Sequence, residues 1–558
     1  MNNGLQILDY SAIALYLVLM AGVGVALGMV VKNVKDFFAG GNSVPWHLGA
    51  VSNYMTMMSA FVFVAHASVA YEHGLISILI LWSAVPAALF GTAFLAKRWR
   101  RAALVTPVEY LEQRYNASVR QIVSWGGVLF RVLENMVRLY ALGIFVSGAL
   151  GCSMTQAIVV CGGIVVVYTM VGGLWAVIVT DAVQGAILMM ITIVMLPLVF
   201  NACGGLGALT DALPEHFTWT NGPKGRFGFL LVYYVMNIIK FNGNWAFIQR
   251  FYSTKNEREA VKLGLFSAFL FFICPIVFMI PAIAAAHLCP DLANGEEAYV
   301  AVCKLLLPPG VMGLMIAAML AATMSTLSSD YNVTAGVLTR DIYQRIFRKN
   351  ADSREQMLVA RLMTLALGIL IIVGAGAVQH FGGAFNANMM LMGLIGFPLT
   401  VPLVAGVLWR RFKPYGAVTS MITGIILGAV LMGVDGMTWA QTTFYEMIWC
   451  VGVMLFSAIG ESGKAEYRER VVSLFRQLST PVIEESDSAK GTIVVMRLFS
   501  LALGLGGVLF AVMSLFSIDE ISGRYTLTAG IACCLLAAVS FYHLRKVRTA
   551  DVSSTGDD

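Results

Sequence analysis

A stripe of hydroxyl-bearing and small side chains runs along one long apolar segment of the chain. Ala322, Ser325, Thr326 and Ser329 recur at the spacing i, i+3, i+4 and i+7, so they share one face of a helix. Small residues at a helix–helix contact produce a similar pattern, but five hydroxyl groups and Asp330 lie within eight residues. Hard cations prefer several oxygen ligands, and the stripe therefore indicates a binding site for a monovalent cation.

Asp181 lies in another long apolar segment, with no basic residue nearby in its own predicted helix. A carboxylate inside a membrane span needs a bound cation, a proton or an arginine from a distant segment. Three interpretations of Asp181 therefore stay open: a ligand of a cation, a proton-coupling group, or one half of a structural salt bridge.

The second apolar segment has polar residues at Ser52, Asn53, Thr56 and Ser59. Such hydroxyl groups can bond to carbonyl groups one turn earlier in a continuous helix. Alternatively, the helix is broken here and exposes its carbonyl groups to a cation. These residues alone do not distinguish the two possibilities.

Lys240 is flanked by Asn237 and two further asparagines, as expected of a segment that lines a solute. A lysine that extends towards the membrane surface from a helix end would look the same. Glu134 and Arg138 are four residues apart, and their simplest interpretation is an ion pair within one helix.

The composition defines the elements that must position these residues. Of 558 residues, 58% are hydrophobic and 12% are charged, whereas soluble proteins carry about 25% charged residues. This excludes a soluble enzyme, a nucleic-acid-binding protein and a disordered scaffold. Many apolar segments exceed the ~20 residues that cross a bilayer as a helix, and they are too long for the strands of a membrane barrel. We therefore expect an all-α polytopic membrane protein with about 15 transmembrane helices, at residues 8–31, 45–72, 75–98, 119–151, 153–171, 173–201, 227–248, 258–288, 309–345, 356–380, 385–409, 414–435, 439–460, 493–518 and 526–546.

The positions of Lys and Arg predict the orientation of these helices. If the N-terminus is outside, every internal loop of more than one residue is basic, whereas the external loops are short or nearly balanced in charge. The internal basic clusters then lie at 32–35, 97–101, 250–262, 345–354, 410–413, 461–492 and 545–548. Because basic residues are enriched in cytoplasmic loops, we expect a multi-pass protein of the plasma (inner) membrane with its C-terminus in the cytoplasm.

Several motifs, in order and at the same spacing, make the chain similar to the sodium:solute symporter family over about residues 8–460. They are Asp36-Phe-Phe-Ala-Gly-Gly41, Thr106-Pro-Val-Glu-Tyr-Leu-Glu-Gln-Arg114, Gly172-Gly173-Leu-Trp-Ala-Val with Thr180-Asp181 and Gln184, Ile248-Gln249-Arg250, the stretch Ala317–Asp341, and Leu408-Trp-Arg-Arg-Phe-Lys-Pro-Tyr-Gly416.

The resemblance implies an inverted five-plus-five helix repeat of the leucine-transporter type. Residues 45–201 would form the first repeat and residues 202–409 the second. Residues 1–44 would hold an extra helix and the first internal loop, and residues 410–558 the peripheral C-terminal helices and tail. The second and seventh helices would be the broken ones.

The resemblance also implies a first sodium site between the first broken helix and the hydroxyl stripe. Its ligands here would be the carbonyl groups of Met55, Met58 and Ala322 and the hydroxyl groups of Ser325 and Thr326.

Some members of the family hold a second sodium ion deeper in the protein. Asp181, Ser325, Ser328 and Ser329 match the ligands of that second site. We therefore expect one or two sodium ions to bind. Asp330 is an additional acid, which either strengthens the deeper site or pairs with a basic residue.

The solute site departs from that of the sugar-transporting members. Met57, Phe61 and Val62 make the pocket apolar, and each sugar hydroxyl left without a partner would cost ~1–3 kcal/mol. Lys240 suits a carboxylate, so a small organic anion is expected, with a sugar or polyol as the alternative. The residues expected at the solute are Ser59, Glu134, Asn237, Lys240 and Phe241.

The resemblance thus predicts a sodium-coupled symporter, not an enzyme, that works by alternating access. Its partners would be a small solute, sodium and the lipid bilayer, with no nucleic acid. A proton-coupled carrier that uses Asp181 is the nearest alternative. A membrane-embedded solute sensor that does not transport is an alternative of another class.

Overall fold

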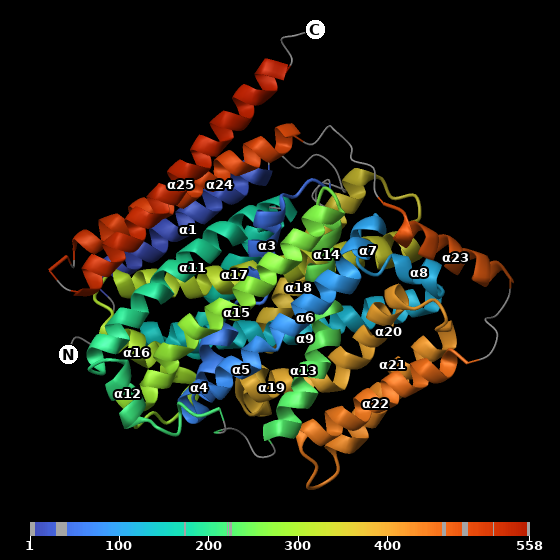
Figure 1. Cartoon of the computed structure of the whole chain (residues 1–558), viewed down its shortest axis with the longest axis horizontal. Helices are drawn as coiled ribbons and strands as arrows, with labels where there is room; N and C mark the ends of the chain where they lie inside the picture. Colours follow the sequence, from blue (N-terminus) through green and yellow to red (C-terminus); the bar gives the residue numbers. More distant parts are fainter. Residues whose placement is uncertain are drawn as a thin grey trace.

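The computed structural model is a bundle of helices of very different lengths (Figure 1). It describes residues 6–554 except 29–41, 172–173, 220, 222–225, 460–464, 482–488, 517 and 520. The basic cluster 32–35, the motif 36–41, Gly172-Gly173 and parts of the loop 461–492 therefore lie outside the described residues.

Long apolar helices, several of them divided by a short irregular or π-helical turn, make up the bundle. They are α1 (Ile7–Gly28), α5 (Ile76–Trp82), α6 (Ala84–Phe90), α7 (Ala96–Arg101), α9 (Ala117–Leu150), α10 (Met154–Val171), α11 (Leu174–Ala202), α15 (Glu257–Leu288), α17 (Val311–Val337), α18 (Ser353–Ala375), α19 (Gly383–Leu391), α20 (Phe397–Leu408), α21 (Pro414–Met432), α22 (Trp439–Ser457), α24 (Ala489–Leu515) and α25 (Ile521–Ser554). The short helices are α8 (Tyr110–Arg114), α12 (Leu206–Ala212), α16 (Ala298–Leu306) and α23 (Ala465–Ser479).

Several long helices begin where a side chain caps their first free N–H groups. The side chains of Asn116, Asn256 and Asp352 accept hydrogen bonds from backbone N–H groups at the starts of α9, α15 and α18. The far end of α9 stops at Gly151, whose φ of 66° is left-handed and favours glycine. Local sequence therefore defines where these helices start, and the apolar content between the caps drives their burial.

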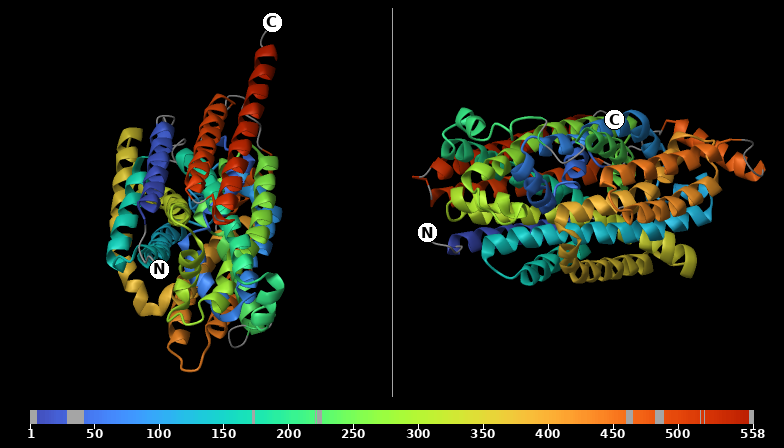
Figure 2. Two further views of the ribbon diagram at one scale, coloured as in Figure 1. Left: turned by 90° about the vertical axis from the view of Figure 1, so that its left-hand side faces the viewer. Right: turned by 90° about the horizontal axis from the view of Figure 1, so that it is seen from below.

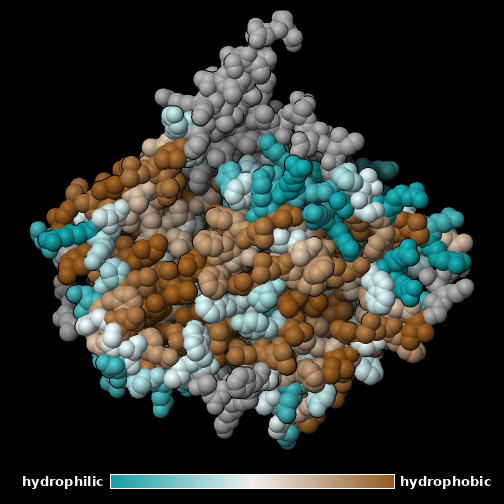
Figure 3. Space-filling view, in the orientation of Figure 1, coloured by the Kyte–Doolittle hydropathy of each residue, from teal (hydrophilic) through white to brown (hydrophobic). Residues whose placement is uncertain are grey.

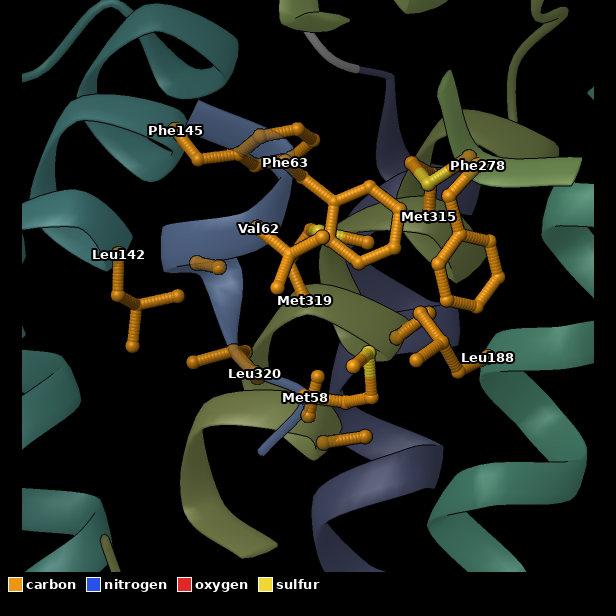
Figure 4. Packing of buried hydrophobic residues seen from close by; sticks show 14 of the residues in the cluster. Met58, Val62, Phe63, Leu142, Phe145, Leu188, Phe278, Met315, Met319 and Leu320 are labelled. Atoms are coloured by element: carbon orange, nitrogen blue, oxygen red, sulfur yellow. The ribbon is translucent and has the colours of Figure 1, made fainter. Parts of the chain in front are cut away.

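The second span is broken. This agrees with the interpretation of its polar residues in which the helix is interrupted and exposes its carbonyl groups. Four non-helical residues, 56–59, follow the end of helix α3 (Trp46–Met55), and a π-helical turn (η2, Val62–His66) leads into α4 (Ala67–His73). The freed backbone groups find partners on α17, because the Ala60 N–H donates to Thr323 Oγ1 at 2.9 Å. Figure 4 shows the apolar wall around this break.

The seventh span is broken as well. Helix α13 (Arg226–Asn242) ends before Gly243, and α14 (Trp245–Ser253) begins after Asn244, whose side chain accepts from the Ala246 N–H at 2.9 Å. The break lies tightly against α20, because a Cβ atom at Gly243 would lie 2.7 Å from Thr400 Cβ. Glycine at this position lets the two backbones approach.

Helix α17 is the centre of the bundle. Every one of its residues is buried, and it packs against α1, α9, α10, α11 and α18. Figure 2 shows the long helix α9 running the length of the molecule beside α10 and α18. The hydroxyl stripe of α17 therefore faces protein on all sides and makes no contact with lipid.

Helix α1 is attached to the start of α17 by a buried carboxylate. Asp9, 2% exposed, accepts hydrogen bonds from the backbone N–H groups of Gly310 and Gly313, each at 2.7 Å. These N–H groups have no acceptor within their own helix, and a negative charge at a helix N-terminus is favourable.

Charged residues gather where α8, α9 and the end of α17 meet. Arg120 of α9 binds Glu112 of α8 at 2.7 Å and, through Nε, Asp341 at 2.8 Å. Arg345 also pairs with Glu112. Asp341 and Arg345 belong to the π-helical continuation of α17 (η5, Leu338–Phe347). This group of four residues, here called the basal latch, joins three elements.

The surface is mainly apolar, as a membrane environment requires. Figure 3 shows apolar residues over most of one face and hydrophilic residues gathered near α7 and α14. Within the described residues, eight helices are long and apolar enough to cross a membrane, or nine if α9 and α10 are counted as one bent span. Each half of a broken span is too short to be counted as a membrane-crossing helix by itself. The number of about 15 spans therefore stays a prediction.

Candidate functional site

Four of the five residues expected at the first sodium site lie together. The hydroxyl oxygen of Thr326 is 2.7 Å from the Met58 carbonyl oxygen and 3.2 Å from those of Met55 and Ala322. Two of these carbonyl groups belong to the broken span and the third to α17. One cluster of oxygen atoms therefore joins the break to the hydroxyl stripe.

Asp181 of α11 has an arginine partner that its own helix does not reveal. Its Oδ2 is 3.4 Å from Nη2 of Arg250 in α14, and neither side chain is exposed. The same carboxylate accepts hydrogen bonds from Ser52 at 2.5 Å and from Ser325 at 2.6 Å. An ion pair thus links two spans that are far apart in sequence. Ser325, which precedes Thr326 in α17, donates a hydrogen bond from its hydroxyl group to this pair and not to the first cluster.

The guanidinium group of Arg250 binds two of the residues expected at the second sodium site, Asp181 and Ser329, and also Ser52. Arg250 Nη2 donates to Ser329 Oγ at 2.7 Å and to Ser52 Oγ at 3.0 Å. The hydroxyl group of Ser328 instead donates to the Ser325 carbonyl group of its own helix at 3.1 Å. A sodium ion at Asp181 and the Arg250 guanidinium group would therefore compete for the same ligands.

A small cavity lies beside the break in the second span, with a volume of about 60 Å³. This volume is enough for roughly four water molecules. Ser59, Glu134, Asn237 and Lys240 line it. The fifth residue expected at the solute does not line it, because Phe241 packs behind the wall, 5.4 Å from the ring of Phe271, which does line the cavity, and 4.3 Å from that of Phe247 (ring centroids).

A buried network of charges forms one side of the cavity. Glu134 accepts from Lys240 at 2.9 Å and is 3.1 Å from both Arg131 and Arg138. Asp330 pairs with Arg138 and lies 3.5 Å from Arg131. The pair within α9 is therefore present, and Lys240 does not extend to the membrane surface. Three cations and two anions give this network one excess positive charge.

Sequence reasoning missed several residues of the cavity wall. Arg138, assigned only to an ion pair, also lines the cavity, as do His66 and Asn388. Nδ1 of His66 is buried without a hydrogen-bond partner among the described residues. A histidine inside a predicted span was the available signal for this position, whereas nothing local indicated that Asn388 would face the same space.

These features define a class of protein: a membrane transporter, all-helical over the residues that the structure describes, with a broken helix beside a buried cluster of oxygen atoms. The family model of the sodium:solute symporter family matches residues 37–424. The chain belongs to this family, whose members are sodium-coupled transporters and not enzymes.

Individual relatives are similar over most of their length. A sodium/glucose cotransporter of Vibrio parahaemolyticus is 26% identical, over 83% of this chain and 92% of its own. A sodium/sialic acid symporter of Proteus mirabilis is 27% identical, over 81% of this chain and 94% of its own. A solved structure of a sodium-coupled sialic acid symporter, in a substrate-bound outward-open state with a novel sodium site, matches with a TM-score of 0.72 at 24% identity, over 81% of this chain and 97% of its own. That match shows that the two chains share a fold.

Proposed function

We propose that this sodium-coupled symporter imports a small solute that carries a carboxylate group. The excess positive charge beside the cavity is the observation that supports the proposal. Arg138 and Lys240 both line the cavity, yet both are already bound to Glu134. A solute carboxylate would neutralise the remaining charge, and a buried charge without a counterion is costly.

The small volume of the cavity favours a short solute. A space for roughly four water molecules matches an organic acid of a few heavy atoms, and the flexible side chains of Met57 and Met392 in its wall can adapt to it. The ring of Phe61 and the side chain of Val62 face the apolar part of such a solute.

Sodium at the first cluster would couple to the solute because their ligands share one element. Met55 and Met58 supply carbonyl oxygens from the broken span, and Ser59 of the same break lines the cavity. A sodium ion that bridges this break to Thr326 therefore holds the solute-lining residues in place. Each ion that moves inward gains ~2.3 kcal/mol per 100 mV of membrane potential.

A second ion at Asp181 would have to displace the Arg250 guanidinium group from Ser329 and the carboxylate. Arg250 belongs to α14, the second half of the other broken span. Exchange of one cation for another at Asp181 would then release α14 and link the second ion to movement of that half-helix.

The architecture that accompanies this function is also a proposal. The two broken spans are the first expected spans of residues 45–201 and 202–409, which supports the inverted five-plus-five repeat. The basic clusters support an N-terminus outside the plasma membrane and a cytoplasmic C-terminus.

Uptake into proteoliposomes tests the proposal. With an inward sodium gradient, short carboxylates should accumulate and compete with one another, whereas their amides and alcohols should not. Replacement of sodium by potassium at fixed pH should abolish accumulation. Undiminished uptake in potassium would reject sodium coupling, and binding without flux would favour a sensor.

The variant Lys240→Met tests the role assigned to the excess charge. It removes one cation and leaves Glu134 paired with Arg138, so the protein should fold. We expect the KM for a carboxylate to rise at least tenfold, the equivalent of about 1.4 kcal/mol, with a much smaller change in kcat. An unchanged KM would show that Lys240 does not contribute to recognition of the anion.

A neutral sugar or polyol is the second candidate. Ser59, Ser83, Asn237 and Asn388 line the cavity and supply neutral hydrogen-bonding groups, and the relatives include sodium/glucose and sodium/myo-inositol cotransporters. Sodium-dependent uptake of a polyol that persists in Lys240→Met would favour this candidate over a carboxylate.

A further inference from the structure

A buried acid outside the sites described above has no partner. The side chain of Glu446, at the middle of α22, is 0% exposed. Neither of its carboxyl oxygen atoms has a hydrogen-bond partner among the described residues, and the same is true of the hydroxyl group of Thr443, three residues earlier in the same helix.

The carboxyl group lies between two glycines of neighbouring helices. A Cβ atom at Gly428 of α21 would lie 3.1 Å from Glu446 Oε1. A Cβ atom at Gly393 would lie 3.8 Å from Oε2 and 3.0 Å from Thr443 Oγ1. Gly393 belongs to the π-helical segment Met392–Gly396 (η7) that joins α19 to α20. The two glycines therefore leave space for a side-chain carboxyl group against bare backbone.

Among the described residues, no ion pair to this carboxyl group is found. Helices α20 and α21 and the segment η7 contain no acidic or basic residue. Helix α13 also packs against α22, but its Lys240 is bound to Glu134. The titratable groups nearby are the thiol of Cys450, one turn further along α22, which donates to the Ser420 carbonyl group, and the phenol of Tyr233 in α13, whose ring contacts Trp439.

An ionised carboxylate in these surroundings would be strongly unfavourable. Transfer of an unpaired charge into an apolar environment costs so much that the group becomes neutral instead. A hydroxyl group and two glycine backbones cannot supply the opposite charge that Glu134 and Asp181 receive from arginines. Glu446 differs from those two acids in this respect.

The segment that touches Glu446 also lines the solute cavity. Met392, the first residue of η7, and Asn388, one turn earlier in α19, both line the cavity. Gly393 follows Met392 directly, and a Cβ atom there would lie 3.8 Å from Glu446 Oε2. Charge on Glu446 would thus disturb the packing of the same backbone segment whose other side forms the cavity wall.

We propose that Glu446 is a proton-binding site within the membrane and that its protonation permits the packing of η7 on which transport depends. The ligand is a proton, and the site is independent of the two sodium sites and of the identity of the solute. Loss of the proton at high pH places a charge between α22 and η7 and slows transport.

The variant Glu446→Gln tests this inference, because glutamine has the shape of the protonated acid but cannot ionise. Sodium-driven uptake by the wild type should fall several-fold between about pH 7 and about pH 9, the range in which buried carboxyl groups ionise. Uptake by Glu446→Gln should stay constant over this range. Asp435→Asn, which changes an exposed acid in the loop before α22, should behave as the wild type does.

Chemical labelling of the wild type gives a second measurement that needs neither a known solute nor a folded variant. A hydrophobic carbodiimide reacts with protonated carboxyl groups in membranes, and mass spectrometry locates the adduct. We expect an adduct at Glu446 whose yield falls as pH rises. Absence of the adduct at every pH, a yield that depends on sodium instead of pH, or identical pH profiles of the wild type and Glu446→Gln would overturn the inference.

Discussion

At the scale of single residues, the hydroxyl group of Thr326 is the point at which three carbonyl oxygens from two spans meet. Thr326→Ala should raise the sodium concentration for half-maximal uptake at least tenfold. The physical reason is the loss of one oxygen ligand, worth about 1.5–3 kcal/mol when it faces a charge. Sodium titration of uptake measures the effect.

Two controls accompany this prediction. Thr326→Ser keeps the hydroxyl group and should retain a sodium requirement close to that of the wild type. Thr334→Ala removes a buried hydroxyl group two turns further along the same helix and should leave the sodium requirement unchanged. An equal effect of Thr334→Ala and Thr326→Ala would mean that the loss reflects packing of α17.

Asp181→Asn should lower both stability and the charge moved in each cycle. The change leaves the Arg250 guanidinium group buried without a counterion, which costs about 3–5 kcal/mol, and thermal unfolding measures that loss. Arg250→Gln added to Asp181→Asn should restore much of the stability.

The transport current of Asp181→Asn should also vanish. Two sodium ions transported with one solute carboxylate carry one net positive charge, whereas one sodium ion transported with the same solute carries no net charge. A current equal to that of the wild type would place the second ion elsewhere.

The sequence predicted the oxygen-rich residues of the site but not their partners. The stripe on α17 follows from helical spacing, and the pair Glu134–Arg138 from a separation of four residues. The partners Asp181 and Arg250 are 69 residues apart, and Lys240 lies 106 residues from Glu134. Only the packing of whole helices brings such pairs together, and no local pattern encodes it.

At the scale of helices, the contact between α20 and the break that separates α13 from α14 depends on Gly243. Gly243→Ala would place a methyl group 2.7 Å from Thr400 Cβ, and overpacking of this kind costs about 1–3 kcal/mol. We expect a lower unfolding temperature and slower transport. Gly163→Ala in α10 is the matched control, because a Cβ atom there meets nothing within 4 Å. A loss of stability as large in Gly163→Ala would contradict the steric argument.

The basal latch predicts a response to acid. Burial acts to raise the pKa of Glu112, but hydrogen bonds from Arg345 and Arg120, together with their charges, outweigh it and hold the pKa below the ordinary value of 4.5. An acid with a lowered pKa stabilises the folded state above its unfolded pKa, and this contribution is lost as the pH falls through the folded pKa.

Thermal unfolding at a series of pH values below about 5 checks this expectation. The unfolding temperature of Glu112→Gln should start lower than that of the wild type and should lose less on acidification. If the two proteins lose stability in parallel, the acid response arises from another group.

At the scale of the whole molecule, the apolar segments were the most predictable features. The breaks after Met55 and at Gly243 were expected only from the family resemblance, because the polar residues of the second span fitted a continuous helix as well. Which helix occupies the centre was not predictable from composition, because α17 is as apolar as helices that face lipid. Its complete burial results from the helices that surround it.

The orientation of the whole bundle stays a prediction with a direct test. A fluorescent protein that folds only in the cytoplasm should fluoresce when fused after Asp558. The same reporter fused after Ile518, in the loop between α24 and α25, should remain dark, because that loop lies outside. The opposite pattern would invert the proposed orientation.

The carboxylate of Asp9 has a consequence for the order of assembly. Its acceptor atom belongs to α1, whereas its donors, the N–H groups of Gly310 and Gly313, are synthesised about three hundred residues later. Until then α1 must remain beside the insertion machinery or lie at the bilayer edge with an acid that has no docking place. Packing of the helices strictly in the order of their synthesis would therefore leave Asp9 without its donors until the start of α17 is made.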